Sequence, residues 1–288
     1  MIPAGQTFGL TRPRFSSDTS LLITDAQGAP AIVGVADMIG RPAGLRWRNY
    51  MKTAVRLIRK RLLESHLESL EERAVFLQEQ LSHHNRIIRE VSRHHDQTAF
   101  GFCIAAAAVA GAQCSLNWLG DCRAYRIRRV SGRSPAIECR VLTQDHNALE
   151  TMIRSEGARS LFRGEMQELG KTILYHLGTD PDRADAVLLA QQVTLELERG
   201  ECLLFMTDGV TTPLTRVLLN RNQDLLDNGS LYLENFLSEW LSEQPEALDR
   251  ELPWEIVVRR LVQHVELFTH QYPTYRDDIA VTGYFLPS

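Results

Sequence analysis

The sequence predicts an α+β fold in which β-sheets form a sandwich and helices pack outside it. Strand patterns occur in blocks near both ends and in the middle of the chain. Helical patterns separate these blocks instead of alternating with single strands, which disfavours a doubly wound parallel sheet. The 288 residues are 44% apolar, enough for one large domain or two small ones. Because no internal repeat or low-complexity linker divides the chain, we treat 1–288 as a single domain.

The first half of the chain has strand patterns on both sides of a long helical region. From residue 45 to about 94, apolar residues recur every three or four positions with Arg and Lys between them, which is typical of two amphipathic helices or of one that breaks. Short apolar runs bounded by turn residues predict strands. These are Ser20–Thr24, Ala31–Asp37, Phe100–Ala108, Cys114–Leu119, Ala124–Arg128 and Cys139–Leu142.

The second half of the chain carries both kinds of pattern. Helices are predicted at Leu149–Glu156, Gly164–Leu169, Leu231–Leu241 and Glu255–Phe268. Strands are predicted at Val193–Glu198, Cys202–Met206 and Ile279–Phe285.

The composition excludes several classes of protein. A formal net charge of -4 and a pI of about 6.2 disfavour a nucleic-acid-binding protein, since such domains are usually basic. The five cysteines are odd in number and form no CxxC, so neither a disulfide framework nor a zinc knot is expected. No signal peptide and no apolar run of roughly 20 residues is found. We therefore expect a cytoplasmic protein without a membrane partner.

Three aspartates share one kind of position in the predicted strands. Asp37 and Asp208 each end an apolar run, and Asp277 immediately precedes the last one. Carboxylates held at strand ends can converge on hard cations such as Mg²⁺ or Mn²⁺. Aspartate also favours strand ends simply because it starts turns, so the positions alone leave both interpretations open.

Five sequence blocks, in order and at matching spacing, carry a resemblance to a known family. They are VADMIG (35–40), LNWLGDCRAY (116–125), LTQDHN (142–147), LERGECLLFMTDGV (197–210) and DDIAV (277–281). The chain resembles the metal-dependent protein phosphatases, the type 2C serine/threonine phosphatases, in a bacterial-like form, from about Gly9 to Phe285.

This resemblance implies two antiparallel sheets flanked by helices, an α-β-β-α arrangement with two divalent cations, Mn²⁺ or Mg²⁺, at one end. Asp37 would bridge both ions, and the backbone carbonyl of Met38 would help to hold one of them. Asp208 and Asp277 would complete the site, and Asp121 would belong to a third, weaker metal site. Such ions make a water nucleophilic near neutral pH and offset charge on the phosphoryl oxygens.

The implied activity is hydrolysis of phosphoserine and phosphothreonine in proteins. The partners would be a phosphorylated protein substrate and an opposing Ser/Thr kinase. Residues 147–178 fall where bacterial members carry a mobile flap beside the cleft.

Two stretches depart from the family pattern. Met38 and Ile39 stand where the family has glycine and where some relatives have a histidine proposed as general acid. In the first block, Asp18 matches an aspartate that orders metal-bound water from outside the ligand set. Arg12 and Arg14 are the candidates for binding the substrate phosphate, and Arg12 has the better offset from the preceding glycine.

The departures leave alternatives to the active protein phosphatase. One is a phosphatase-like domain with impaired turnover that acts as a binding or regulatory module. Another is a metal-dependent hydrolase of small phosphoesters.

A separate feature is the basic stretch Arg41–Arg61, which contains eight Arg and Lys residues and no acid. It is either a docking face for an acidic or phosphorylated partner or simply a solvated helix face.

Overall fold

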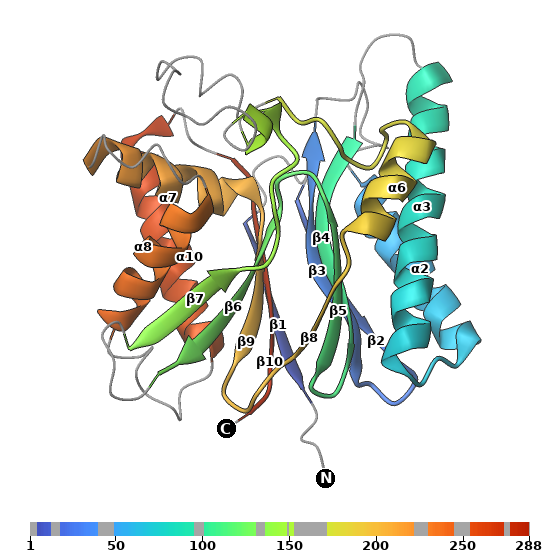
Figure 1. Cartoon of the computed structure of the whole chain (residues 1–288), viewed down its shortest axis with the longest axis horizontal. Helices are drawn as coiled ribbons and strands as arrows, with labels where there is room; N and C mark the ends of the chain where they lie inside the picture. The colour runs from blue at the N-terminus through green and yellow to red at the C-terminus, as the bar shows by residue number, and fades with distance from the viewer. Residues whose placement is uncertain are drawn as a thin grey trace.

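Two five-stranded antiparallel sheets pack face to face, and helices cover both outer faces (Figure 1). The structure is a computed structural model that describes residues 5–12, 18–39, 49–94, 101–130, 136–148, 150–152, 172–221, 230–244, 254–273 and 277–287. Six helices and ten strands lie within those ranges. The α+β sandwich expected from the sequence is therefore confirmed.

The first sheet is covered by helices from the second half of the chain. Its strands run in the order β1 (Gln6–Arg12), β10 (Ile279–Phe285), β9 (Cys202–Met206), β6 (Arg123–Arg129), β7 (Ile137–Val141). One apolar cluster joins this sheet to α7 (Asp208–Arg221), α8 (Ser230–Ser242) and α10 (Trp254–Gln271).

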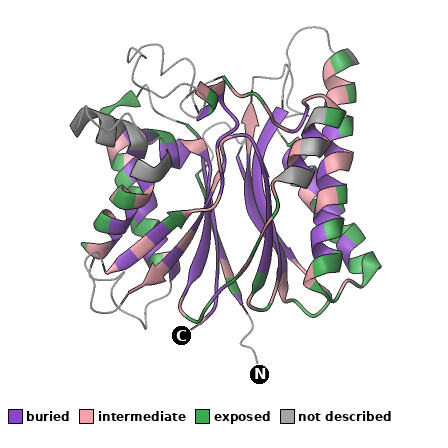
Figure 2. Ribbon diagram, in the orientation of Figure 1, coloured by how far each residue is buried: buried purple, intermediate pink, exposed green. Residues whose placement is uncertain are grey.

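The second sheet is covered by helices that come mostly from the first half. Its order is β2 (Thr19–Thr24), β3 (Pro30–Ile39), β4 (Gly101–Ala110), β5 (Gln113–Leu119), β8 (Val193–Glu196). A second cluster joins it to α2 (Tyr50–Ser65), α3 (Leu70–His94) and α6 (Pro181–Ala190). A third cluster fills the space between the sheets, so buried residues occupy the middle of the molecule (Figure 2).

The long helical region is two helices, and the break has a local cause. His66 adopts a left-handed conformation with φ 49°, which ends α2. Ser69 and Glu72 then form a reciprocal cap before α3: the Ser69 hydroxyl accepts from the Glu72 N–H at 3.2 Å, and the Glu72 carboxylate accepts from the Ser69 N–H at 3.0 Å. Of the two arrangements that the periodicity allowed, two separate helices are present.

Strand register brings several strand ends to one edge of the sandwich. Arg12, the last residue of β1, pairs with Ile279, the first of β10, while Gln6 pairs with Phe285 at the opposite end. β9 runs antiparallel to β10 and ends at Met206, opposite Val281. The edge that carries the end of β1 is therefore opposite the one where Gln6 and Phe285 pair.

Two expectations can be compared only in part. The predicted helix at Gly164–Leu169 lies outside the described residues, as does most of the one at Leu149–Glu156. Among the helices that the structure describes, none combines the length and the apolar character needed to span a membrane.

Candidate active site

Asp37 is directed into the space between the two sheets. Along β3, Val33 and Val35 belong to the cluster between the sheets, and Asp37 continues the alternation on that face because strand side chains repeat with period two. Met38 packs instead against the cluster under α2 and α3. The methionine side chain therefore points away from the candidate site.

Asp18 lies next to Asp37 through strand pairing. It directly precedes β2, whose first residue, Thr19, pairs with Ala36. The side chain is buried, at 3% exposure. A carboxylate buried in this way needs a compensating partner.

Asp121 reaches the same region from the end of β5. The preceding Gly120 has φ 95°, and a Cβ there would lie 2.2 Å from the Cys103 sulfur. Only glycine fits this tight turn, which places Asp121 beside Cys103. Cys103 in turn pairs with Asp37 across β4 and β3.

Asp208 and Asp277 are held together by the residue between β9 and α7. Thr207 donates its backbone N–H to the Ala280 carbonyl at 3.1 Å, and its hydroxyl accepts from the Ala280 N–H at 3.1 Å. This double link fixes the start of α7 against the start of β10. The neighbouring Asp278 is fully buried and donates its N–H to Asp277 Oδ1 at 2.8 Å.

The five carboxylates raise one another's pKa values. Burial raises the pKa of Asp37 well above its usual value, and the charges of Asp208, Asp18 and Asp121 raise it further. Burial likewise raises the pKa of Asp208, together with the charges of Asp121, Asp277 and Asp18. Five aspartates from separate parts of the sequence thus share one electrostatic environment, in which each disfavours ionisation of the others.

Two of the carboxylates have moderately raised pKa values. Burial raises the pKa of Asp18 to about 7, although the nearby Asp37 and Thr207 groups lower it by hydrogen bonding. Burial and the charge of Asp145 raise the pKa of Asp121 to about 6. At neutral pH the folded protein therefore gains stability from anything that neutralises this cluster.

The donor set fits hard divalent cations. Both carboxylate oxygens of Asp18 and Oδ1 of Asp208 are buried without a well-formed hydrogen bond. Within the described ranges, no three His, Cys, Asp or Glu side chains form a preformed metal-binding group. The carboxylates are nevertheless close enough to shift one another's pKa, and oxygen-only donors with excess negative charge are what Mg²⁺ and Mn²⁺ prefer.

A buried ion pair supports the turn that carries Asp121. Arg123 donates to both carboxylate oxygens of Asp145, at 2.9 and 2.7 Å. His146 Nδ1 accepts from the Gly120 N–H at 3.1 Å, and its ring stacks on Trp118. The sequence contained these residues in the GDCR and LTQDHN blocks, but their pairing follows only from the fold.

The structure describes only one of the two candidate phosphate ligands. Arg12 is exposed, and its Nε lies 3.5 Å from Glu266 Oε1 of α10. Arg14 lies outside the described residues. The role of each in binding phosphate stays a prediction.

The two ends of the expected flap, 147–178, are joined at its base. Asn147 and Ile173 form an antiparallel bridge, and Ala148 donates its N–H to the Thr172 carbonyl at 2.9 Å. Most of the segment between them lies outside the described residues.

The cysteines are unsuited to nucleophilic catalysis. All five are free and buried. Burial raises the pKa of Cys103 and Cys122 well above the usual thiol value, and nearby aspartate charges add to the effect. Both thiols therefore stay protonated beside the carboxylate cluster.

Comparison with known proteins gives matches at the level of structure. No family model and no curated protein matches the chain. A serine/threonine phosphatase of S. agalactiae superposes with a TM-score of 0.68 at 19% identity, covering 98% of this chain and 99% of that one. PppA, a regulatory component of the T6SS in Pseudomonas aeruginosa, gives 0.63 at 17% identity, covering 99% and 98%. The catalytic domain of the phosphatase PstP, solved in complex with two manganese ions, gives 0.62 at 14% identity, covering 99% of both chains. The fold implied by the sequence blocks is thus confirmed: this chain has the fold of the bacterial serine/threonine phosphatases.

Proposed function

We propose that this chain is a metal-dependent protein serine/threonine phosphatase that hydrolyses phosphoserine and phosphothreonine. The observation that carries the proposal is that Asp18, Asp37, Asp121, Asp208 and Asp277 act on one another electrostatically. Oxygens of Asp18 and Asp208 are also buried without a well-formed hydrogen bond. No structural role explains five mutually repelling carboxylates at one edge of a sandwich, whereas cations would neutralise them.

The roles of the residues are those that the sequence resemblance implies. Asp37, Asp208 and Asp277 would hold two divalent ions, Mn²⁺ or Mg²⁺, with the backbone carbonyl of Met38 as a further ligand. Asp18 would order water around them. When bound, the ions would supply a nucleophilic water and offset charge on the phosphoryl group.

The remaining site residues would act on the substrate or on a weaker ion. Asp121 would hold a third ion. Arg12 or Arg14 would bind the substrate phosphate, since a guanidinium can donate two parallel hydrogen bonds to it. For Arg12, this role requires exchanging Glu266 for phosphate, which the high exposure of the arginine permits.

The partners belong to the same proposal. The substrate would be a phosphorylated protein in the cytoplasm, and a Ser/Thr kinase would oppose the reaction. The structures that superpose on this chain include serine/threonine phosphatases and one with two manganese ions, which supports the proposal at the level of the fold.

The test is hydrolysis of a phosphothreonine peptide by purified protein with Mn²⁺, with Mg²⁺ and with excess chelator. Activity that requires the metal supports the proposal. Asp208→Asn is expected to abolish this activity while thermal unfolding stays cooperative. Wild-type rates in that variant would contradict the assignment of Asp208. A strong preference for a small aryl phosphate over the peptide would favour the small-ester hydrolase instead.

One observation favours a second candidate, a binding module without turnover. Arg12, the phosphate ligand suggested by sequence offset, contacts Glu266 in the structure. If folded protein binds a phosphothreonine peptide but does not hydrolyse it with either metal, the module is the better description.

A further inference from the structure

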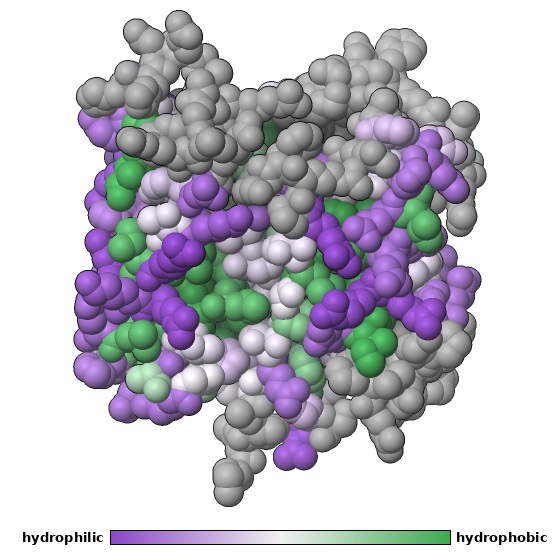
Figure 3. Space-filling view, turned by 180° about the vertical axis from the view of Figure 1, so that it is seen from behind, coloured by the Kyte–Doolittle hydropathy of each residue, from purple (hydrophilic) through white to green (hydrophobic). Residues whose placement is uncertain are grey.

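Helix α2 (Tyr50–Ser65) has a basic side that faces away from its buried side. Its buried residues are Met51, Ala54, Ile58 and Leu62, which pack toward β2 and the second sheet. Four exposed cations follow each other at helical spacing on the opposite side, and we name them the basic stripe: Lys52, Arg56, Arg59 and Lys60. In the view from behind, the helices that lie on the right of Figure 1 are on the left. The side chains along that margin are mostly hydrophilic (Figure 3).

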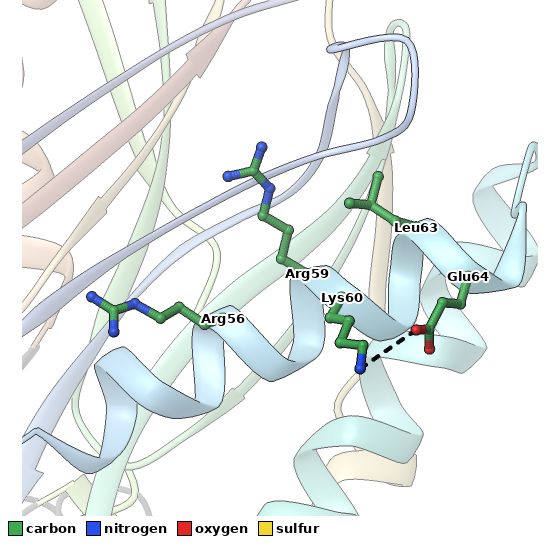
Figure 4. A pocket seen from close by; sticks show the side chains of 5 residues that line it. All are labelled: Arg56, Arg59, Lys60, Leu63 and Glu64. Atoms are coloured by element: carbon green, nitrogen blue, oxygen red, sulfur yellow. Dashed lines mark ion pairs between the residues drawn. The ribbon is translucent and has the colours of Figure 1, made fainter.

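The surface around the stripe forms a shallow hollow of about 360 Å³. It is lined by Arg56, Arg59, Lys60, Leu63 and Glu64. Arg56 and Arg59 extend away from the helix, whereas Lys60 turns toward Glu64, 3.8 Å away (Figure 4). Two guanidinium groups therefore flank the hollow, and Leu63, at 36% exposure, gives it an apolar floor.

The two arginines have no anionic partner in the described part of the chain, although other surface arginines do. Arg128 pairs with Glu138 at 2.7 Å and Arg259 with Glu255 at 2.6 Å. Neither Arg56 nor Arg59 makes an ion pair or hydrogen bond within the described ranges. Like charges three or four positions apart destabilise a helix. In the described chain, only the exposed Lys60–Glu64 ion pair offsets this cost.

We propose that the basic stripe of α2 is a docking surface for an acidic segment of a partner protein. Arg56 and Arg59 would form charge-assisted hydrogen bonds with its carboxylates, and an apolar side chain of the segment would rest on Leu63. The planar guanidinium suits such paired contacts better than an ammonium does.

An acidic protein segment fits this surface better than a lipid membrane or nucleic acid. Helices that bind membrane surfaces insert a wide apolar face, but the apolar face of α2 is buried against the sheet. Nucleic acid would be repelled by a chain with a net charge of -4. A short acidic segment engages the stripe without approaching the rest of the surface.

Docking at the stripe does not depend on the aspartate cluster. The stripe lies on the outer side of α2, while Asp37 is directed between the sheets. A layer of buried side chains and the second sheet separate the two. The proposal therefore stands apart from the phosphatase proposal, and binding at the stripe can be measured without turnover.

The experiment is fluorescence anisotropy. A labelled peptide in which Glu residues alternate with Leu-Ser pairs is titrated with the whole chain at low and at moderate salt. The double variant Arg56→Glu/Arg59→Glu is expected to bind more than about tenfold more weakly than wild type, because two charge-assisted contacts are replaced by repulsion. Binding by the wild type is expected to weaken as salt increases.

The matched control is Arg93→Glu/Arg199→Glu, which changes two exposed arginines elsewhere and alters the net charge equally. It is expected to bind the peptide within about threefold of wild type, since only long-range charge differs. Circular dichroism on both double variants establishes that they are folded. Equal loss in the two variants, or no peptide binding by wild type, overturns the proposal. Binding of wild type to vesicles of anionic lipid but not to the peptide also overturns it, in favour of a membrane surface.

Discussion

Gly209 lies against the backbone of Asp278, so that a Cβ at Gly209 would be 1.8 Å from the Asp278 carbonyl oxygen. No larger residue fits there without moving one of the two segments. Asp208 directly precedes Gly209, and Asp277 directly precedes Asp278. The contact therefore fixes the distance between these two aspartates. The geometry of two candidate metal ligands therefore depends on a glycine that carries no functional group.

Gly209→Ala is expected to weaken the site through this contact. Overpacking costs about 1–3 kcal/mol and should displace α7 from β10, so both stability and Mn²⁺-dependent hydrolysis should fall. Thermal unfolding and peptide hydrolysis measure the two effects. Gly28→Ala is the control, because Gly28 has φ 81° but open space around it; it should lower stability and leave the rate unchanged. Wild-type stability and activity in Gly209→Ala would contradict the close contact.

Asp18→Asn is expected to change the pH dependence of stability in chelator. Unfolded Asp18 ionises near pH 3.8, whereas the folded pKa is about 7. Since a raised folded pKa means that ionisation disfavours the fold, this contribution to stability is present below pH 4 and is lost as pH rises toward 7. Asn cannot ionise, so Asp18→Asn does not lose stability in this way. Its free energy of unfolding should exceed that of wild type by an amount that grows across this window, to at most about 4 kcal/mol.

Urea denaturation at several pH values measures this difference. Glu243→Gln, which removes one exposed carboxylate elsewhere, serves as the control. Saturating Mn²⁺ should reduce the advantage of Asp18→Asn, because a cation stabilises the ionised cluster. An advantage that is constant with pH would contradict the raised pKa of Asp18.

Asp145→Ala is expected to destabilise the fold strongly. It leaves the buried guanidinium of Arg123 without its partner, and breaking a buried pair costs about 3–5 kcal/mol. Glu255→Ala removes the exposed partner of Arg259 and should cost about 0.5 kcal/mol or less. Urea denaturation of both variants checks the contrast. Similar costs would mean that the Arg123 pair is solvated.

Met38→Leu is expected to leave metal-dependent hydrolysis within about twofold of wild type, since the side chain packs under α2 and α3 and a Leu conserves its volume. Asp37→Asn, one position earlier, should abolish activity. Metal titrations of the two variants separate a backbone role at Met38 from a side-chain role. A large loss in Met38→Leu would show that the methionine side chain acts in the site.

The elements that the sequence predicted well have strong local patterns. The strand Ile279–Phe285 and the helix pattern that became α10 are apolar and periodic, and the structure has both. β1 was not predicted, because Gln6–Arg12 pairs with β10 at the other end of the chain and has only Phe8 as a buried anchor.

Two helices were also missed, for different reasons. α7 contains Gly209 and Pro213, both poor helix formers, and is held by burial of its apolar residues against the first sheet. For α6 a signal existed: Asp180 caps it by accepting from the Asp182 N–H, and Pro181 follows at the first helical position.

Part of the candidate site could likewise be predicted from the sequence, and part could not. Asp37, Asp208 and Asp277 could be found from the blocks that contain them, and the structure brings them into one cluster. The burial of Asp278 and the pairing of Arg123 with Asp145 depend on contacts between distant segments, so no local pattern indicates them.

The pairing of β1 with β10 has a consequence for how the protein is made. On the ribosome, β10 emerges after both β1 and β9, yet it lies between them in the finished sheet. Until it arrives, both neighbours present unpaired strand edges, and Asp208 lacks the support of Asp277 and Asp278. Nascent chains that lack β10 should therefore hold an incomplete first sheet and no assembled carboxylate cluster.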